Sequence, residues 1–301
     1  MKTRLTVPVS AKGWRLDQFL RDEMPEFSRA RLQGWVKEGR VTVNGAAVRA
    51  SLGLRGGEVV EVEPAAPPPL RAVAEDLPVT VLYEDSDVIA VDKPAGMAVH
   101  AGAGTHSGTL VNALLHRYGK LAETGEGLRP GIVHRLDKLT SGVVVVARTE
   151  RAHRALARQF AGREVEKVYV ALVRGELKEE RGEIRLPITR DPVHRTRMTA
   201  RLGRGREAVT WWRRLRRYKG FTLVEVRIGT GRTHQIRAHF AAIGHPVAGD
   251  RLYGAAGHES GRFFLHARRI RFTSPTTGEP VEITAAMPEE LEGWLKELEA
   301  L

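Results

Sequence analysis

The sequence predicts an α+β protein in two unequal parts, a small unit of helices and short strands followed by a large sheet flanked by helices. Apolar runs of strand length, such as 143–147 and 167–173, are bounded by turns, and the stretch between them carries apolar residues at helical spacing. A proline-rich stretch separates the two parts, because successive prolines favour extended backbone and cannot join a sheet ladder. We therefore expect a small domain at 13–63, a linker at 64–78 and a larger domain at 79–301.

The small domain is expected to contain two helices and a hairpin. An apolar helical stripe begins at Leu16, and Ser28 is suited to cap a second helix that ends at Gly39. An Asn44-Gly45 turn then joins two short strands. Basic residues crowd this unit, which indicates either an RNA-binding surface or a solvated basic face. They are Arg29, Arg31, Lys37, Arg40 and Arg49.

The composition indicates a polyanionic partner. The 301 residues include 48 Lys and Arg against 36 Asp and Glu, a formal net charge of +12, with a sequence pI near 10.3. Such a charge on a chain of globular composition favours nucleic acid. The absence of cysteine excludes disulfides, thiolate nucleophiles and cysteine zinc sites. Without an apolar run of membrane-spanning length or a signal peptide, we expect a cytoplasmic protein with no membrane partner.

The most informative stretch is Gly131-Ile-Val-His-Arg-Leu-Asp-Lys-Leu-Thr-Ser-Gly142. It predicts a buried strand, a polar turn and a second apolar strand. In an extended segment residues two apart share a face, so Arg135 and Asp137 would point one way and His134 the other. An aspartate at this junction can cap the turn, form a structural ion pair or act as a charged catalytic group. The same Arg-Leu-Asp tripeptide at 15–17 is expected to lie on a solvated helix face.

The twelve-residue run resembles the signature motif of the RluA family of pseudouridine synthases. Further stretches resemble other motifs of this family: Asp92–Gly104, the strand that contains Tyr169, and Thr230–Gly254. Residues 28–45 resemble the small RNA-binding domain first described in ribosomal protein S-four. The resemblance therefore covers nearly the whole chain in the family's order.

This resemblance implies a mixed, mostly antiparallel sheet and the isomerisation of specific uridines in RNA to pseudouridine, with no metal and no cofactor. Asp137 would attack C1′ of the ribose or remove the C2′ proton, and both routes stay open. Tyr169 would stack on the detached uracil, and Arg237 would pair with Asp137 and position it. The residues expected to contact RNA are Arg135, His134, Arg232, Arg29, Arg31 and Arg40.

Within the family, the stretches 99–104 and 109–115 are most similar to the large-subunit ribosomal, RluD-like branch, although Leu139-Thr-Ser141 departs from the Asp-Thr-Thr often found there. The implied substrate is 23S ribosomal RNA, free or in pre-ribosomal particles, and the implied state is a monomer. Three alternatives remain at this point. They are a synthase acting on transfer RNA, a non-catalytic ribosome-assembly factor, and a glycoside or nucleoside hydrolase, which would need a second, opposed carboxylate.

Residues 201–219 combine eight basic residues with interleaved aromatic ones. On a strand Trp211 and Arg213 would share a face, which could stack on bases and pair with phosphates. Alternatively, the tryptophans pack inward and the charges face water. The glycine-rich stretch 101–108 lacks the Gly-Lys-Ser/Thr of a phosphate-binding loop, and His234 and His239 are not at the spacing of a helical zinc pair.

Overall fold

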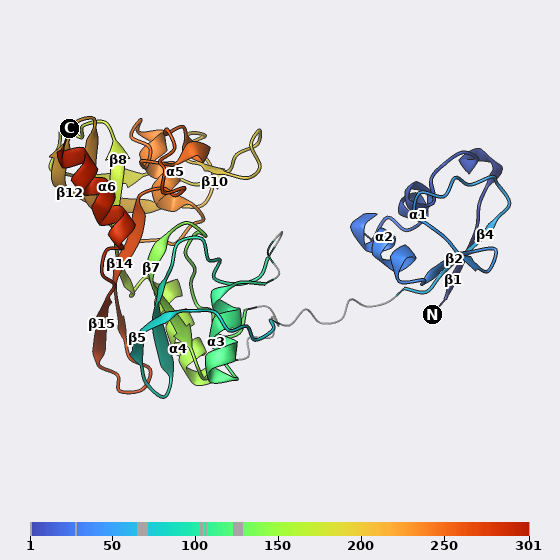
Figure 1. Cartoon of the computed structure of the whole chain (residues 1–301), viewed down its shortest axis with the longest axis horizontal. Coiled ribbons are helices and arrows are strands. Elements are labelled where there is room, and N and C mark those ends of the chain that lie inside the picture. The colour runs from blue at the N-terminus through green and yellow to red at the C-terminus, as the bar shows by residue number, and fades with distance from the viewer. Residues whose placement is uncertain are drawn as a thin grey trace. The chain divides into compact units, whose positions relative to one another are not determined.

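The computed structural model describes residues 2–27, 29–64, 72–102, 105, 107–122 and 129–300. The chain divides into two compact units, Met1–Pro69 and Leu70–Leu301 (Figure 1). Ser28, the predicted helix cap, and much of the proline-rich stretch lie outside the described residues, as does part of the glycine-rich stretch. Among the described helices, none combines the length and apolar character that crossing a membrane requires.

The N-terminal unit packs two helices against a four-stranded sheet of order β1-β4-β2-β3. The predicted helices and hairpin form, and Asn44 and Gly45 both adopt the left-handed conformation that this tight turn requires (φ 51° and 79°). Strand β1 was not predicted; it pairs with β4 and extends the unit beyond the predicted start at residue 13. The elements are β1 (Thr3–Thr6), η1 (Val9–Ala11), α1 (Leu16–Glu23), α2 (Arg29–Lys37), β2 (Val41–Val43), β3 (Ala46–Ala47) and β4 (Val59–Val62).

The second unit is built on one large sheet of order β5-β6-β7-β14-β8-β13-β12-β9, with β15 paired to β14. Strand β14 runs parallel to β7, and the other neighbouring strands pair antiparallel. The predicted α+β class with a mixed, mostly antiparallel sheet is therefore confirmed. The strands are β5 (Thr80–Glu84), β6 (Val88–Lys93), β7 (Ser141–Ala147), β8 (Glu166–Arg174), β9 (Arg181–Arg185), β12 (Val209–Tyr218), β13 (Phe221–Ile228), β14 (Leu265–Thr273) and β15 (Pro280–Thr284), with a separate hairpin of β10 (Thr189–Arg190) and β11 (Met198–Thr199).

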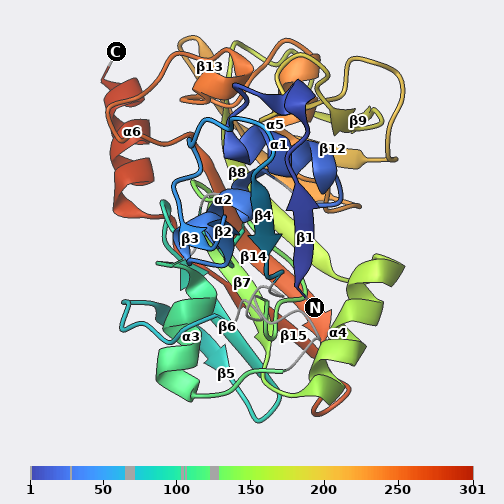
Figure 2. The same ribbon diagram turned by 90° about the vertical axis from the view of Figure 1, so that its right-hand side faces the viewer.

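Helices cover different parts of this sheet. Figures 1 and 2 show α3 and α4 beside the part made by β5, β6 and β7, and α5 beside the part that contains β12. Thr149 caps α4 as predicted, because its hydroxyl accepts a hydrogen bond from the Ala152 N–H (3.2 Å). The helices are α3 (Leu110–Tyr118), α4 (Glu150–Gly162), α5 (Gln235–Ala242), η2 (Arg251–Tyr253) and α6 (Glu289–Glu299).

Two predicted elements differ from the structure. The strand expected before Asp137 is reduced to a single bridge between Ile132 and Val146. Strand β14 pairs only with Ser141 and Gly142 of β7, and the rest of that edge faces the segment before Asp137. There the Gly131 carbonyl accepts the Ala147 N–H (2.8 Å), but the His134 ring, rather than a backbone carbonyl, accepts the Val145 N–H (2.9 Å), so the ladder does not continue. The helix expected from Arg232 begins at Gln235, because His234 has a left-handed backbone (φ 54°) that an α-helix excludes.

The end of the predicted linker belongs to the second unit. The Asn112 side-chain amide donates to the Val73 carbonyl (2.6 Å), and the Glu75 N–H donates to the Asn112 carbonyl (3.0 Å). These bonds join residues 73–75 to the first turn of α3. A truncation that preserves the second unit should therefore begin before Val73.

Candidate active site

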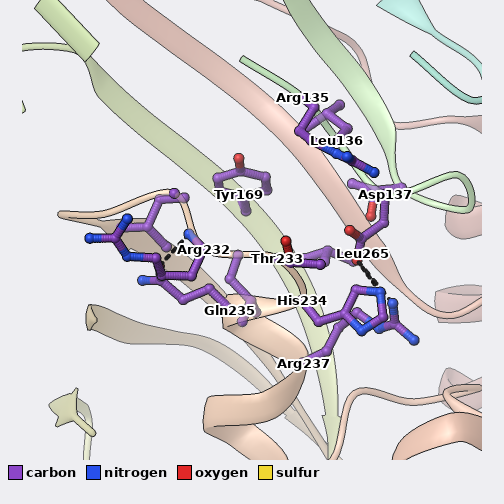
Figure 3. Close-up of a pocket in the computed structure, with 14 residues that line it drawn as sticks. Arg135, Leu136, Asp137, Tyr169, Arg232, Thr233, His234, Gln235, Arg237 and Leu265 are labelled. Carbon is purple, nitrogen blue, oxygen red and sulfur yellow. Dashed lines mark hydrogen bonds and ion pairs between the residues drawn. The ribbon is translucent and has the colours of Figure 1, made fainter. Parts of the chain in front are cut away.

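A pocket lies where the loop before β7 and the turn before α5 meet β8 and β14. It brings together the three predicted catalytic residues, Asp137, Tyr169 and Arg237. Figure 3 shows Asp137 and Arg237 on one side, Arg232 on the other and Tyr169 between them. Apolar side chains also line it, namely Leu136, Ile228, Ile236 and Leu265.

Arg237 holds Asp137 from one side. Its Nη1 donates to Asp137 Oδ2 (2.9 Å), while Nε and Nη2 donate to the two carboxylate oxygens of Asp250 (2.6 and 3.0 Å). The guanidinium lies 5.1 Å from the ring centre of Tyr253 and 4.3 Å from that of Phe263. Burial lowers the pKa of Arg237, but the bonds and charges of the two carboxylates outweigh it and raise that pKa above its ordinary value. The cation is therefore permanent and fixed in direction.

The backbone beside Asp137 is anchored by Lys93. The Lys93 ammonium is fully buried and donates to the carbonyls of Pro94 (2.7 Å), Met97 (2.8 Å) and Lys138 (3.2 Å). Burial lowers the pKa of Lys93 to about 7. The Lys138 carbonyl also accepts from the Gly96 N–H (2.8 Å), and the Thr140 N–H closes a turn on the Asp137 carbonyl (3.0 Å). Asp137 therefore projects from a rigid turn rather than from a mobile loop.

The Asp137 carboxylate has one oxygen bound and one available. Oδ2 receives the bond from Arg237, whereas Oδ1 accepts no hydrogen bond from the part of the chain that the structure describes. The side chain is 18% exposed, in keeping with its place at the pocket. A carboxylate that is held at one oxygen and open at the other can react with a bound molecule.

Tyr169 forms the wall of the pocket from β8. Its side chain is mostly buried, and burial together with the nearby Asp137 charge raises the pKa of the Tyr169 phenol above its ordinary value. The phenol is therefore neutral near pH 7. A flat, neutral ring beside an accessible carboxylate suits stacking on a planar, uncharged base.

His234 was not expected to belong to this site. Its Nε2 lies 3.9 Å from Asp137 Oδ2, and its Nδ1 lies 3.1 Å from the Tyr253 hydroxyl. Burial lowers the pKa of His234, so the ring is neutral at neutral pH. His234, Tyr253 and Asp250 all stand within the last motif quoted from the sequence, but nothing in their spacing indicated that they support Arg237 and Asp137.

Comparison with known proteins agrees with this geometry. Residues 87–242 match the RNA pseudouridylate synthase family, and residues 14–60 match the S4 domain. The chain belongs to the pseudouridine synthase family. The predicted family and enzyme class are thereby confirmed, and its substrate is RNA.

Individual relatives span nearly the whole synthase. An uncharacterized RNA pseudouridine synthase of Aquifex aeolicus is 45% identical over 97% of both chains. Ribosomal large subunit pseudouridine synthase D of Xanthomonas campestris is 44% identical and covers 95% of this chain and 89% of its own. Among solved structures, human RNA pseudouridylate synthase domain containing 1 is 26% identical, with a TM-score of 0.58 over 79% of this chain and 98% of its own.

The synthase does not bring all of its predicted RNA-binding residues to the pocket. Arg135 and Arg232 line it, and Arg135 is exposed. His134 is directed elsewhere: its Nε2 accepts the Val145 N–H (2.9 Å), and its ring stacks on Phe160 (4.7 Å between ring centres). Burial, helped by the charge of Lys167, lowers the pKa of His134 to about 3. His134 is thus a neutral residue that packs against β7 and α4.

The three arginines predicted in the N-terminal unit are engaged with neighbours. Arg29 donates to Asp17 (2.9 Å), Arg40 pairs with Glu38 (3.1 Å), and Arg31 lies over the rings of Phe27 and Trp35. The expectation that Arg15-Leu16-Asp17 forms a solvated helix face is wrong for Asp17, which is 0% exposed. Its partners Arg29 and Gln33 come from the next helix, which the tripeptide alone could not reveal.

The basic and aromatic strand β12 has a mixed character. Trp212 packs into the core, whereas Trp211 is 40% exposed and donates from Nε1 to Glu183 (3.1 Å). Neighbouring strands supply acids that balance the arginines: Arg213 pairs with Glu225 (3.1 Å). The excess of positive charge seen in this stretch of sequence is therefore partly neutralised on the folded surface.

Proposed function

We propose that this synthase isomerises specific uridines of 23S ribosomal RNA and that Asp137 is the reacting carboxylate. The observation that carries the proposal is the Asp137 side chain, bound at one oxygen by Arg237 (2.9 Å) and open at the other beside Tyr169. Relatives 40–45% identical that are named ribosomal large subunit pseudouridine synthase D support the choice of RNA. The alternative is that the enzyme forms pseudouridine in transfer RNA.

The reaction rearranges one nucleotide and needs no second substrate. The N1–C1′ bond of uridine breaks, the uracil turns, and a C5–C1′ bond forms, while C5 loses a proton and N1 gains one. Asp137 either attacks C1′ to form an ester or takes the C2′ proton to give a glycal. In both routes Arg237 directs Asp137, and the ring of Tyr169 holds the detached uracil by stacking.

The target uridine must leave its RNA stack to enter this pocket. Extrusion of a base costs on the order of a few kcal/mol, which contacts to the RNA backbone can offset. Arg135 and Arg232 stand at the pocket and can supply such contacts. The N-terminal unit, which a linker within 64–78 joins to the second unit, makes further contacts with the RNA. We place the reaction in the cytoplasm, carried out by a monomer on RNA that is free or within pre-ribosomal particles.

Pseudouridine mapping tests this proposal directly. Ribosomal and transfer RNA from cells with the protein, without it, or with only Asp137→Asn would be mapped position by position. We expect sites in 23S RNA that disappear in the deletion and are not restored by Asp137→Asn. Asp76→Asn, which changes an exposed aspartate outside the pocket lining, is the matched control and should restore them. Loss of pseudouridine only from transfer RNA would reject 23S ribosomal RNA as the substrate. Restoration of the sites by Asp137→Asn would reject Asp137 as the reacting residue.

A further inference from the structure

The N-terminal unit carries a shallow, open groove between α2 and the segment 47–52. Its charged lining consists of the exposed side chains of Arg15, Lys37 and Arg49, and no carboxylate is among the described residues that line it. We call the groove that these three residues line the cationic groove. Lys37 and Arg49 make no ion pair with any described residue, so their charges face solvent uncompensated. None of the three arginines named from the sequence as RNA contacts lines this groove.

Arg15 differs from its two neighbours because a buried carboxylate lies beneath it. Arg15 Nε and Nη2 donate to the two oxygens of Asp17 (3.0 and 3.3 Å). Asp17 also accepts from Arg29 (2.9 Å) and Gln33 (2.6 Å). The bond from Arg15, followed by those from Arg29 and Gln33, outweighs burial and holds the pKa of Asp17 well below its usual range. Two guanidiniums share one carboxylate, so the cluster keeps a net positive charge.

The fold fixes this cluster between both walls of the groove. The Asp17 N–H donates to the Ala50 carbonyl (3.0 Å), which ties the start of α1 to the segment that carries Arg49. On the other wall, Gln33 and Lys37 are four residues apart on α2 and share a helix face. The Gln33 amide that reaches Asp17 therefore belongs to the same face as the Lys37 ammonium. Arg15 therefore lines the same groove as the two other cations and is held there by Asp17.

We propose that the cationic groove binds the phosphate backbone of the substrate RNA and that Asp17 is a positioning residue which orients Arg15 for that contact. The inference rests on the proposed function and locates part of its RNA on the N-terminal unit. Arg15 uses Nε and Nη2 on Asp17, which leaves Nη1 to donate to a phosphate oxygen. An arginine already held in place loses less side-chain freedom when it binds.

The direction in which one substitution changes the affinity for RNA distinguishes this role from its alternatives. Asp17→Asn removes a negative charge, so long-range attraction alone would make RNA binding tighter. If Asp17 only joined α1 to α2, the variant would melt at a lower temperature, but its folded form would bind RNA as the wild type does. If Asp17 positions Arg15, binding becomes weaker although the protein has become more positive.

The experiment measures the dissociation constant of the full-length protein for a 23S ribosomal RNA transcript across a salt series. We expect Asp17→Asn and Arg15→Met each to weaken binding about tenfold, the scale of one charge-assisted contact. The double variant should be about as weak as Arg15→Met alone, because Asp17 acts through Arg15. Glu38→Gln is the matched control: it also removes an acid paired with an arginine, but lies outside the groove, and should bind as tightly as wild type or tighter.

Binding by Asp17→Asn that equals or exceeds wild type would overturn the proposal. If this variant does not fold, Arg15→Lys gives the answer, because lysine keeps the charge but cannot bind Asp17 with two parallel N–H groups. Weaker binding by Arg15→Lys supports the positioning role, and unchanged binding rejects it. Pseudouridine formation by the wild type on the same transcript is measured in parallel. Its absence would count against the proposed function, whereas its presence with unaltered Asp17→Asn binding would reject only the groove.

Discussion

The tripeptide Arg-Leu-Asp occurs twice in this chain, at 15–17 and at 135–137, and the charged side chains of the two copies have different partners. Both leucines are buried. In the first copy, arginine and aspartate bind each other, and both oxygens of Asp17 are occupied. In the second, Arg135 is exposed at the pocket, while Asp137 pairs with Arg237, 100 residues away, and keeps Oδ1 open. We propose that this difference in the number of surrounding donors suits Asp17 to position an arginine and leaves Asp137 free to react.

The largest effect should come from Asp137→Asn. The substitution keeps the size of the side chain but removes the charge that both chemical routes need. We expect the single-turnover rate on a substrate RNA to fall at least about a thousandfold, on the order of 4 kcal/mol in barrier. RNA affinity should stay near wild type, in contrast to the weaker binding expected for Asp17→Asn. A fully active Asp137→Asn protein would mean that Asp137 only caps its turn, since asparagine caps turns well.

Arg237→Met should have the next largest effect. The substitution removes the donor at Oδ2, so Asp137 loses its direction, and misplacing a reacting group costs about a hundredfold in rate. Asp250→Asn should lower the rate less, because Arg237 would keep its bond to Asp137 while losing part of its own support. Single-turnover rates for both variants give the comparison. A larger loss of rate in Asp250→Asn than in Arg237→Met would contradict the view that Asp250 acts by supporting Arg237.

Removal of the N-terminal unit should weaken binding without abolishing chemistry. A protein that begins at Ala72 retains Val73 and Glu75, which hydrogen-bond to α3, and should fold. If the cationic groove contacts two or three phosphates, the slope of log K against log salt should decrease in magnitude by about 2 to 3. Salt titrations of binding to 23S RNA, together with pseudouridine formation on short stem-loops, test this. An unchanged slope would show that the N-terminal unit does not hold the RNA backbone.

The smallest effect concerns the pH dependence of stability near His134. Burial lowers the pKa of His134 from 6.5 to about 3, so between these values the unfolded chain binds the proton more readily than the native one. The contribution of His134 is therefore fully present above pH 6.5 and is lost as the pH falls toward 3. We expect the melting temperature of His134→Gln to fall less steeply from pH 6.5 to 4 than that of the wild type. If the melting temperatures of the variant and the wild type fall equally with pH, His134 is not held neutral in the fold.

Much of the fold was predictable because its signals are local. Thr149 and the apolar spacing after it specify α4, the apolar run at 167–173 specifies β8, and the Asn44-Gly45 turn specifies the first hairpin. These features depend on caps, side-chain periodicity and backbone freedom within a few residues. The motif around Asp137 likewise indicated the family without any knowledge of its neighbours.

The roles of the charged residues were decided only by the tertiary structure. The strand expected before Asp137 did not form, because on that edge of β7 the His134 ring, rather than a backbone carbonyl, accepts the Val145 N–H. Asp17 is buried because Arg29 and Gln33 reach it from a second helix, and Arg237 is directed by Asp250, which spacing did not single out. Whether a polar side chain faces water, a partner or a pocket depends on which donors and acceptors folding brings to it. The partners of Asp17 and Arg237 lie 12, 13 and 16 residues away, and Asp137 and Arg237 are 100 residues apart, beyond the reach of local pattern.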